Sequence, residues 1–327
     1  MLKPTRRHFA LGAAAALALP ATAWSQAYPN KPVRMLVGFA PGGPTDILAR
    51  IVAVSLGRSL GQSVVVDNRA GAGGAIAAQA LAKADPDGYT LLFAGDGQLT
   101  LLPQLNPRAG YESLRDFAMV RTVASQSNVL MARRSSGIVS VDALIRQAKA
   151  KPGKLSFGSA GNSTPTHLAG VLFEEATQTE LLHIPYRGAS AAMTDFVGGR
   201  LDMIFVGMPV ALQYAKDDRF AMLAVTGGQR AAALPQVPTF KEAGVGGLGN
   251  EIDVWWAVTA PVGTPPAILQ RLDAATRAAL DDPALRQSFE QQGVTLTNRD
   301  AATTARRVQE DHARWAALVK AGKISAE

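Results

Sequence analysis

The sequence predicts an α/β protein built of two lobes, and three observations support this. Apolar runs of strand length alternate with longer helical runs along the chain, which is typical of α/β architecture. The alternation restarts after Asp116, so a second α/β unit follows the first. Three helical runs close the chain after a single returning strand and have no fresh strands of their own to pack on. We therefore expect them to pack on the first unit, which makes that lobe discontinuous.

The individual elements follow from this alternation. The predicted strands are residues 33–39, 64–66, 90–94, 119–124, 128–132, 155–158, 181–185, 203–206, 222–226 and 255–259. The predicted helices are residues 45–60, 75–83, 141–150, 164–177, 189–198, a helix from 267, 284–292 and 301–321. We assign residues 28–120 with 255–327 to lobe 1 and residues 121–254 to lobe 2, with crossings near 117–126 and 247–257. Two crossing strands make a hinge, and paired lobes hold their ligand in the cleft between them.

The first 27 residues predict an export signal. Arg6 and Arg7 precede an apolar core at 10–19, which is too short to span a bilayer. The arginine pair favours the twin-arginine (Tat) route, with an ordinary Sec signal as the alternative. Small residues permit cleavage after Ala23 or Ala27, and we expect Ala27, which gives a periplasmic protein beginning at Tyr28.

Composition excludes several classes of function. The chain has no cysteine, so thiol chemistry and sulfur-ligated metals are impossible. Its formal charge of +7 falls to +4 without the signal, which holds three cations and no acid. The remaining basic residues are scattered, which argues against nucleic acid as a partner. The histidines beyond the signal, His167, His183 and His312, lack ligand spacing, so we expect no metal and no cofactor.

Three glycine-rich segments lie between a strand and a helix. The first, GFAPGGPTDILAR from Gly38 to Arg50, lacks the lysine of a phosphate-binding P-loop. A helix start there can offer backbone N–H groups to a small anion, or the glycines form only a tight turn that Asp46 caps. The second, at 71–76, departs from the dinucleotide fingerprint and suits close packing or a second anion-facing turn.

The third segment, GSAGNSTPTH at 158–167, does not match the Gly-x-Ser-x-Gly pattern of a serine hydrolase. Its neutral donors Ser159, Asn162, Ser163 and Thr164 suit a carboxylate held by hydrogen bonds. His183 lies on an apolar strand, where we expect a core histidine. Of Trp255 and Trp256, which alternate faces of one strand, one is expected in the core and the other is a candidate for the cleft.

Taken together, these segments resemble one family. YPNKPVRMLVGFAPGGPTDILAR (28–50), VVVDNRAGAGGAIAAQALAKADPDGYTLLFA (64–94), GKLSFGSAGNSTPTHLAG (153–170), IPYRGASAAMTDFVGGRLDMIF (184–205) and APVGTPPAILQRLDAATRAAL (260–280) are similar to the Bug (TctC-type) periplasmic solute-binding receptors of tripartite tricarboxylate transporters. The resemblance implies a two-lobed periplasmic binding protein fold of type II, and an organic carboxylate held partly through ordered waters.

The resemblance also implies the binding residues. One jaw is formed by 39–46, the other by 159–164 with His167, and a third wall by 186–188. The implied ligand-binding residues are Phe39, Gly42, Gly43, Pro44, Thr45, Asp46, Ser159, Asn162, Ser163, Thr164, His167, Tyr186, Arg187 and Gly188. Two positions depart from the family pattern. Asp96 replaces small hydroxyl residues and either faces the ligand or caps the following helix, and Met208 suggests an apolar wall.

The expected function is capture of a small organic carboxylate and its delivery to the membrane subunits of a tripartite tricarboxylate-type transporter. We expect a monomer without enzymatic activity. Two alternatives stay open: an exported α/β hydrolase or lyase that acts on a small carboxylate, and a ligand sensor for a signalling partner. The absence of a nucleophile–base pair from the sequence pattern argues against the enzyme.

Overall fold

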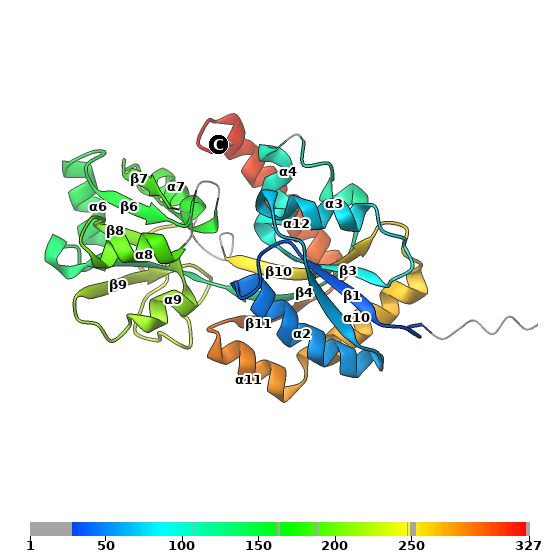
Figure 1. The fold of residues 1–327 in the computed structure, drawn as a ribbon. Coiled ribbons are helices and arrows are strands. Elements are labelled where there is room, and N and C mark those ends of the chain that lie inside the picture. Colours follow the sequence, from blue (N-terminus) through cyan, green and yellow to red (C-terminus); the bar gives the residue numbers. More distant parts are fainter. Residues whose placement is uncertain are drawn as a thin grey trace, which may run out of the picture.

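The computed structural model describes residues 28–106, 108–161, 164–186, 189–246, 248 and 253–324. It contains two sheets that lie in two lobes, as the sequence predicts (Figure 1). The first sheet has the strand order β11-β4-β10-β3-β1-β2, and the second has the order β7-β6-β8-β5-β9. The predicted export signal lies outside the described residues. None of the helices in the described part is long and apolar enough to cross a membrane.

Lobe 1 combines the beginning and the end of the chain. Its elements are β1 (Val33–Val37), α2 (Pro44–Leu60), β2 (Val64–Asn68), η1 (Ala72–Gly74), α3 (Ala75–Ala82), β3 (Thr90–Gly95), η2 (Gly97–Leu101), α4 (Leu102–Leu105), α5 (Ser113–Asp116), β4 (Phe117–Gln126), β10 (Val254–Pro261), α10 (Pro266–Leu280), α11 (Pro283–Gln291), β11 (Thr295–Arg299) and α12 (Ala301–Lys320). Strand β1 pairs in parallel with β2 and β3. Their carboxyl ends therefore meet at one edge of the sheet, where the first two glycine-rich segments follow.

Lobe 2 is continuous in sequence and, like lobe 1, has a strand that pairs in parallel with two neighbours. Its elements are β5 (Asn128–Arg133), η3 (Arg134–Ser136), α6 (Val141–Ala150), β6 (Ser156–Ser159), α7 (Pro165–Thr177), β7 (Leu182–Pro185), α8 (Ala189–Val197), β8 (Met203–Gly207), α9 (Met208–Gln213) and β9 (Phe220–Val225). Strand β6 pairs in parallel with β7 and β8. The third glycine-rich segment follows β6 and opens α7, so it lies at the carboxyl edge of this second sheet.

Two strands connect the lobes. Strand β4 stays in the first sheet through Gln126 and β5 begins at Asn128 in the second, so the chain changes sheets at Ser127. It returns as β10, which pairs with both β3 and β4. Thr226 fastens the two crossings together, because its Oγ1 accepts the Asn128 N–H at 2.8 Å and donates to Asp253 Oδ1 at 2.7 Å.

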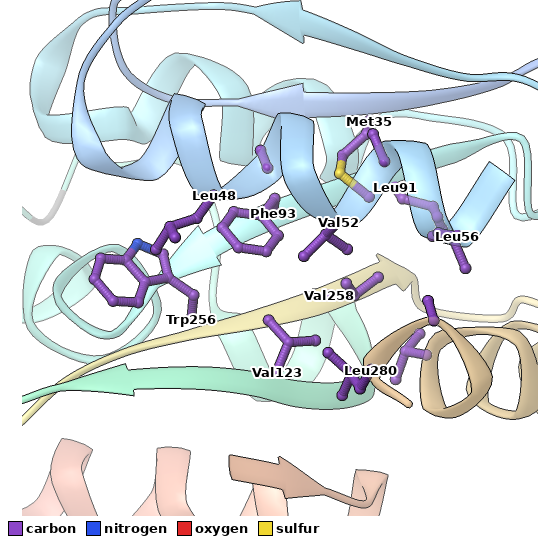
Figure 2. Close-up of a cluster of buried hydrophobic side chains, with 14 of the residues drawn as sticks. Met35, Leu48, Val52, Leu56, Leu91, Phe93, Val123, Trp256, Val258 and Leu280 are labelled. Carbon is purple, nitrogen blue, oxygen red and sulfur yellow. The ribbon is translucent and has the colours of Figure 1, made fainter. Parts of the chain in front are cut away.

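A large part of the core of lobe 1 lies between the first sheet and helices α2 and α10 (Figure 2), and a second buried cluster joins strands β1 and β3 to α3. Leu48, Val52 and Leu56 of α2 pack against Phe93 of β3 and Val258 of β10, and all five are buried. Burying a side chain of this size stabilises the fold by about 1.5–3 kcal/mol. This packing fixes the position of α2, and therefore of the loop that begins it.

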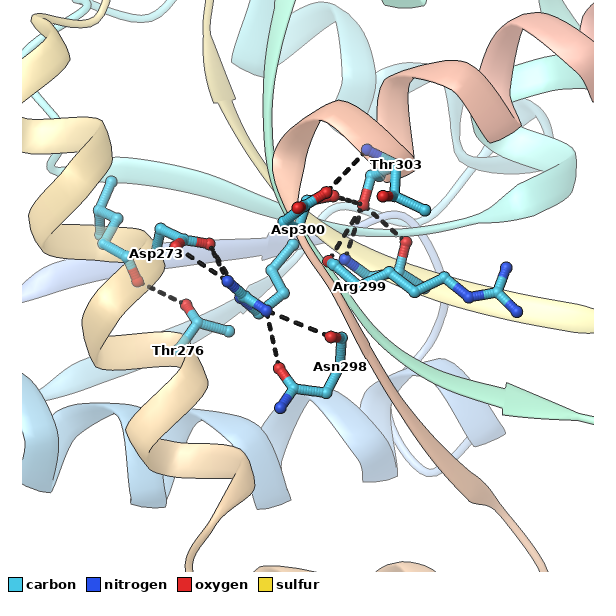
Figure 3. Close-up of polar contacts among 10 residues, drawn as sticks. Asp273, Thr276, Asn298, Arg299, Asp300 and Thr303 are labelled. Atoms are coloured by element: carbon cyan, nitrogen blue, oxygen red, sulfur yellow. Dashed lines mark hydrogen bonds and ion pairs between the residues drawn. The ribbon is translucent and has the colours of Figure 1, made fainter.

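One sequence expectation is wrong: the closing helices do have a fresh strand, β11. It pairs only with β4, at the edge of the sheet, and its sequence Thr-Leu-Thr-Asn-Arg lacks the apolar character that marks a buried strand. The Arg121 guanidinium donates to both oxygens of Asp273 at 2.8 and 2.9 Å and to Asn298 Oδ1 at 2.8 Å (Figure 3). These contacts tie β11 to β4 and α10, and Asn298 has the unusual φ of 41°.

The lobes also meet at the end of α12, which Figure 1 places beside α7. Trp315, Leu318 and Ile324 belong to the same buried cluster as Leu168 and Phe173 of α7. The two lobes therefore share apolar packing in addition to the two connecting strands.

Candidate functional site

The loop after β1 is held by Asp46, the third residue of α2. Its carboxylate accepts the Gly42 N–H at 2.9 Å, Arg50 Nε at 3.0 Å and Asn68 Nδ2 at 2.8 Å. Hydrogen bonding from Arg50 is the main reason why the Asp46 pKa falls to about 2. Asp46 is 2% exposed and its oxygens already have protein partners. It therefore shapes this loop, as a capping residue does.

Backbone donors remain available at the same place. Gly42 has φ of 83°, which an L side chain adopts only with strain, and a Cβ there would meet no neighbour. Pro44 has no N–H, and the first backbone bond of α2 comes from Ile47 to Gly43 at 3.0 Å. The Thr45 and Asp46 N–H groups thus precede the helical ladder and point, with the positive end of the helix dipole, out of its start.

Side chains around these donors are apolar or already bonded. Phe39 is 38% exposed, and its carbonyl accepts Asn68 Nδ2 at 3.0 Å. Thr45 Oγ1 accepts the Trp256 indole N–H at 3.0 Å. Trp255 and Trp256 are both buried. One tryptophan was expected in the core and the other was a candidate for the cleft, but both lie in the core.

The second glycine-rich segment serves close packing, one of the two alternatives for it. A Cβ on Gly38 would lie 2.7 Å from the Gly74 Cα and 2.9 Å from Gln98 Nε2. Gln98 Nε2 donates to the Gly74 carbonyl at 2.7 Å, and the residue is buried. The two glycines let both loops close over Gln98, a residue that the sequence analysis did not single out.

The loop after β6 is the counterpart in lobe 2. Thr164 is the N-cap of α7, with its hydroxyl accepting the His167 N–H, and Pro165 occupies the first turn as Pro44 does in α2. The Ala160 N–H donates to Thr166 Oγ1 at 3.0 Å, and Thr164 Oγ1 donates to the Gly161 carbonyl at 2.7 Å. The segment thus places a second helix start at the carboxyl edge of its sheet.

Ser159 lies at the base of this loop and contacts His183. The Ser159 Oγ and His183 Nε2 are 2.7 Å apart, a separation also found between a nucleophile and its base. Ser159, however, is fully buried, and its Oγ also bonds with both the N–H and the carbonyl of Gly161. A buried hydroxyl that is bonded on all sides cannot reach a substrate carbonyl, so this arrangement is structural.

The two histidines of lobe 2 are stacked. The His167 and His183 rings are 4.1 Å apart with an interplanar angle of 14°, and His183 also stacks on Phe157 at 4.8 Å. Burial, together with the neighbouring His167, lowers the pKa of His183 to about 4, and burial lowers that of His167. Both imidazoles are therefore neutral near pH 7. His183 stacks on the buried Phe157 but is itself only half-buried on an edge strand, so the expectation of a core histidine is wrong, and its ring also contacts the loop.

The predicted third wall is described only in part. The Tyr186 N–H donates to the Ser159 carbonyl at 3.2 Å, so it joins the loop after β6. Its hydroxyl donates to Asp195 Oδ2 on α8 at 2.9 Å, which occupies that end of the side chain. Asn162, Ser163, Arg187 and Gly188 lie outside the described residues.

Asp96 does not cap η2 through its side chain, so that alternative is wrong, and the other, contact with the ligand, stays a prediction. It stands at the start of η2, yet its side chain makes no cap bond to the helix interior. It is buried beside Asp311 and Arg307 of α12. Burial, reinforced by Asp311, raises the Asp96 pKa to about 7, against hydrogen bonds from the Gly97 and Trp255 backbone. Helix η2 follows β3 directly and packs against α12, which brings the Asp96 side chain close to Asp311 and Arg307.

Met208 lies in a groove of about 940 Å³ that is lined by both lobes. Of the predicted binding residues that the structure describes, Met208 alone lines this groove, whose other walls include Arg286 of α11, Arg299 of β11 and the 227–233 segment after β9. Met208 is buried, and a Cβ on Gly293 would lie 3.0 Å from its Cγ. The structure therefore places Met208 at the contact between α9 and the turn before β11.

The described residues include no group of three or more His, Cys, Asp or Glu side chains arranged to hold a metal ion. At the start of α2, the Thr45 and Asp46 N–H groups are available to an anion, and α7 begins in the same way, after a strand and with a proline in its first turn. Residues 48–324 match the family described as "Tripartite tricarboxylate transporter family receptor". The chain belongs to this family.

The chain is also similar to individual proteins, in sequence and in structure. The chain is 36% identical over 309 residues to protein BugT of Bordetella pertussis, which covers 94% of each chain. The structure of the periplasmic binding protein BugD has 32% identity and a TM-score of 0.75, covering 92% of this chain and all of that one.

Two solved relatives contain a ligand. Rpa4515 of R. palustris with adipate has 31% identity and a TM-score of 0.78, covering 92% of this chain and all of that one. MatC of Rhodopseudomonas palustris with bound malate has 28% identity and a TM-score of 0.74, covering 89% and 100%. The family and these structures establish this protein as a solute-binding receptor of the periplasmic type with the two-lobed α/β fold.

Proposed function

We propose that the protein captures a small organic carboxylate between its lobes and delivers it to the membrane subunits of a tripartite tricarboxylate-type transporter. One observation carries the proposal. Helices α2 and α7 belong to different lobes, and each begins after a parallel strand with a glycine-rich loop and a proline in its first turn. Such helix starts attract anions through unpaired N–H groups and the helix dipole.

Two relatives with bound ligands support a proposal for the ligand class. Adipate and malate, the ligands of Rpa4515 and MatC, are aliphatic dicarboxylates of six and four carbons. We therefore place the ligand of this chain among aliphatic carboxylates of similar size. One carboxylate would use the Thr45 and Asp46 N–H groups and the other would bind at the loop after β6, with waters completing the contacts.

We further propose that the carboxylate is held by neutral donors and waters rather than by a buried arginine clamp. The segments 39–46 and 159–164 contain neither Arg nor Lys, and Arg187 is the single basic residue in the three predicted segments. Losing one neutral hydrogen-bonding group should weaken binding by about 1–3 kcal/mol. Truncating one partner of a buried charged pair should cost about 2–5 kcal/mol.

Calorimetry with adipate and malate distinguishes these mechanisms. Ser163→Ala and Asn162→Ala should each weaken binding roughly fivefold to a hundredfold. If Arg187→Ala abolishes binding while both loop variants bind almost normally, Arg187 is the anchor and the neutral cradle is wrong.

The location and partners complete the proposal. We propose export to the periplasm with cleavage after Ala27, and action as a monomer. The decisive experiment is to express the protein in the periplasm, identify the co-purifying small molecule by mass spectrometry, and titrate it back. A binding protein returns the ligand unchanged. Conversion of the added carboxylate would instead establish the hydrolase or lyase alternative.

A further inference from the structure

His183 lies on β7, the edge strand of the second sheet, outside the set of residues predicted to bind ligand. In the β6–β7 register it pairs with Phe157, two residues before Ser159. Its ring stacks on Phe157 of β6 and on His167 of α7. These two contacts come from separate elements, so they fix the ring plane and direct Nε2 toward Ser159, 2.7 Å away.

Ser159 connects this ring to the backbone of the loop. Its Oγ accepts the Gly161 N–H at 3.2 Å and lies 3.0 Å from the Gly161 carbonyl. Its own carbonyl accepts the Tyr186 N–H at 3.2 Å. Gly161 has φ of 133°, and a Cβ there would lie 3.1 Å from the Tyr186 carbonyl, so the turn has little freedom to shift. One hydroxyl thus organises the junction of two predicted walls of the site.

We propose that His183 is a positioning residue for residues 159–161, at the start of the loop to which the proposed function assigns the carboxylate, and that it acts through Ser159 without touching the ligand. A hydroxyl has one proton, and Ser159 Oγ has three polar neighbours. When Oγ–H donates to the Gly161 carbonyl, His183 Nε2–H completes the set by donating to Oγ. When Oγ–H donates to His183 Nε2, the Gly161 N–H still donates to Oγ. Either way, the imidazole determines where the hydroxyl points.

The test compares two substitutions at one position. His183→Phe keeps a ring that can stack on Phe157 and His167 but removes the contact to Ser159. His183→Gln restores an amide that can reach Ser159 while losing the ring. His312→Phe on α12 is a matched control, because His312 lies in lobe 1 and the contact with Gln104 uses its backbone carbonyl, which accepts Gln104 Nε2 at 2.7 Å.

Hydrogen exchange of the full mature protein reads loop order without any ligand. In His183→Phe, amides of 159–164 should exchange about five- to tenfold faster, while amides of β8 and β5 stay within twofold of wild type. His183→Gln should restore loop protection to within about twofold, and His312→Phe should change nothing. Equal protection in all four proteins overturns the proposal. So does uniform acceleration across lobe 2, or failure of the Gln variant to restore the loop, because either means that the ring matters through packing alone.

A second arm measures binding of adipate and malate to the same proteins; it rests on the proposed function, whereas the exchange arm does not. His183→Phe should weaken binding about five- to tenfold, with His183→Gln near wild type. If wild type binds no carboxylate, the proposed function fails and exchange still decides the role of His183. If wild type binds and His183→Phe binds equally well, His183 does not position the loop for ligand.

Discussion

Replacing Asp46 by Asn should destabilise the protein at neutral pH, and the structure sets the size of the effect. The carboxylate holds the Gly42 N–H, Arg50 and Asn68, and its pKa falls from 3.8 to about 2. One pKa unit is worth about 1.4 kcal/mol, so ionised Asp46 contributes about 2 kcal/mol to the free energy of unfolding. Because the folded pKa is the lower one, this contribution is complete above pH 5 and is lost as the pH falls toward 2.

Urea denaturation of wild type and Asp46→Asn tests this directly. The difference in unfolding free energy should be about 2 kcal/mol at pH 7 and about half of that at pH 3. Asp142→Asn is the matched control: Asp142 also pairs with an arginine four residues later, Arg146, but both side chains are exposed. Exposed pairs contribute little, so this variant should lose at most about 0.5 kcal/mol.

A loss below 0.5 kcal/mol in Asp46→Asn, or one equal to the Asp142 control at both pH values, would refute the reasoning. Either result would mean that the loop after β1 keeps its shape without the carboxylate. The prearranged donors at the start of α2 would then need another explanation.

Three further predictions concern other parts of the molecule. Asp96 has a folded pKa raised to about 7, so its stabilising contribution is complete below pH 3.8 and is lost as the pH rises through 7. Between pH 6 and pH 8, the unfolding free energy of Asp96→Asn, measured by urea denaturation, should therefore rise by about 1 kcal/mol relative to that of wild type. Parallel pH profiles of the two proteins would contradict this. Ligand should close the hinge, so small-angle scattering should give a smaller radius of gyration with bound adipate or malate; an unchanged radius with binding proved by calorimetry would mean that the lobes are fixed. Replacing both Arg6 and Arg7 by Lys should leave precursor in the cytoplasm, and normal maturation would assign the signal to the Sec route.

The sequence by itself determined the α/β class, the two lobes and the positions of most elements. These features depend on local periodicity and on strand and helix boundaries, which short stretches of sequence encode. Helix α2 and strand β4 illustrate this, because their apolar patterns matched the observed elements to within about two residues at each end. The short polar strand β11 had no such pattern, since its pairing with β4 is decided by a partner far away in the chain.

Tertiary structure alone decided what the polar side chains contact. Asp46 was predicted at a helix start. Its bond with Asn68 could not be predicted, because the fold brings Asn68 from another element. Its pairing with Arg50 could have been predicted, because the two residues are four apart on one helix. Asp96 turned toward Asp311, and His183 reached Ser159, because α12 and β7 bring residues distant in sequence within bonding range. A hydrogen bond needs its two atoms within about 3 Å. Periodicity places a residue on a face, and only the packing of whole elements sets such a distance.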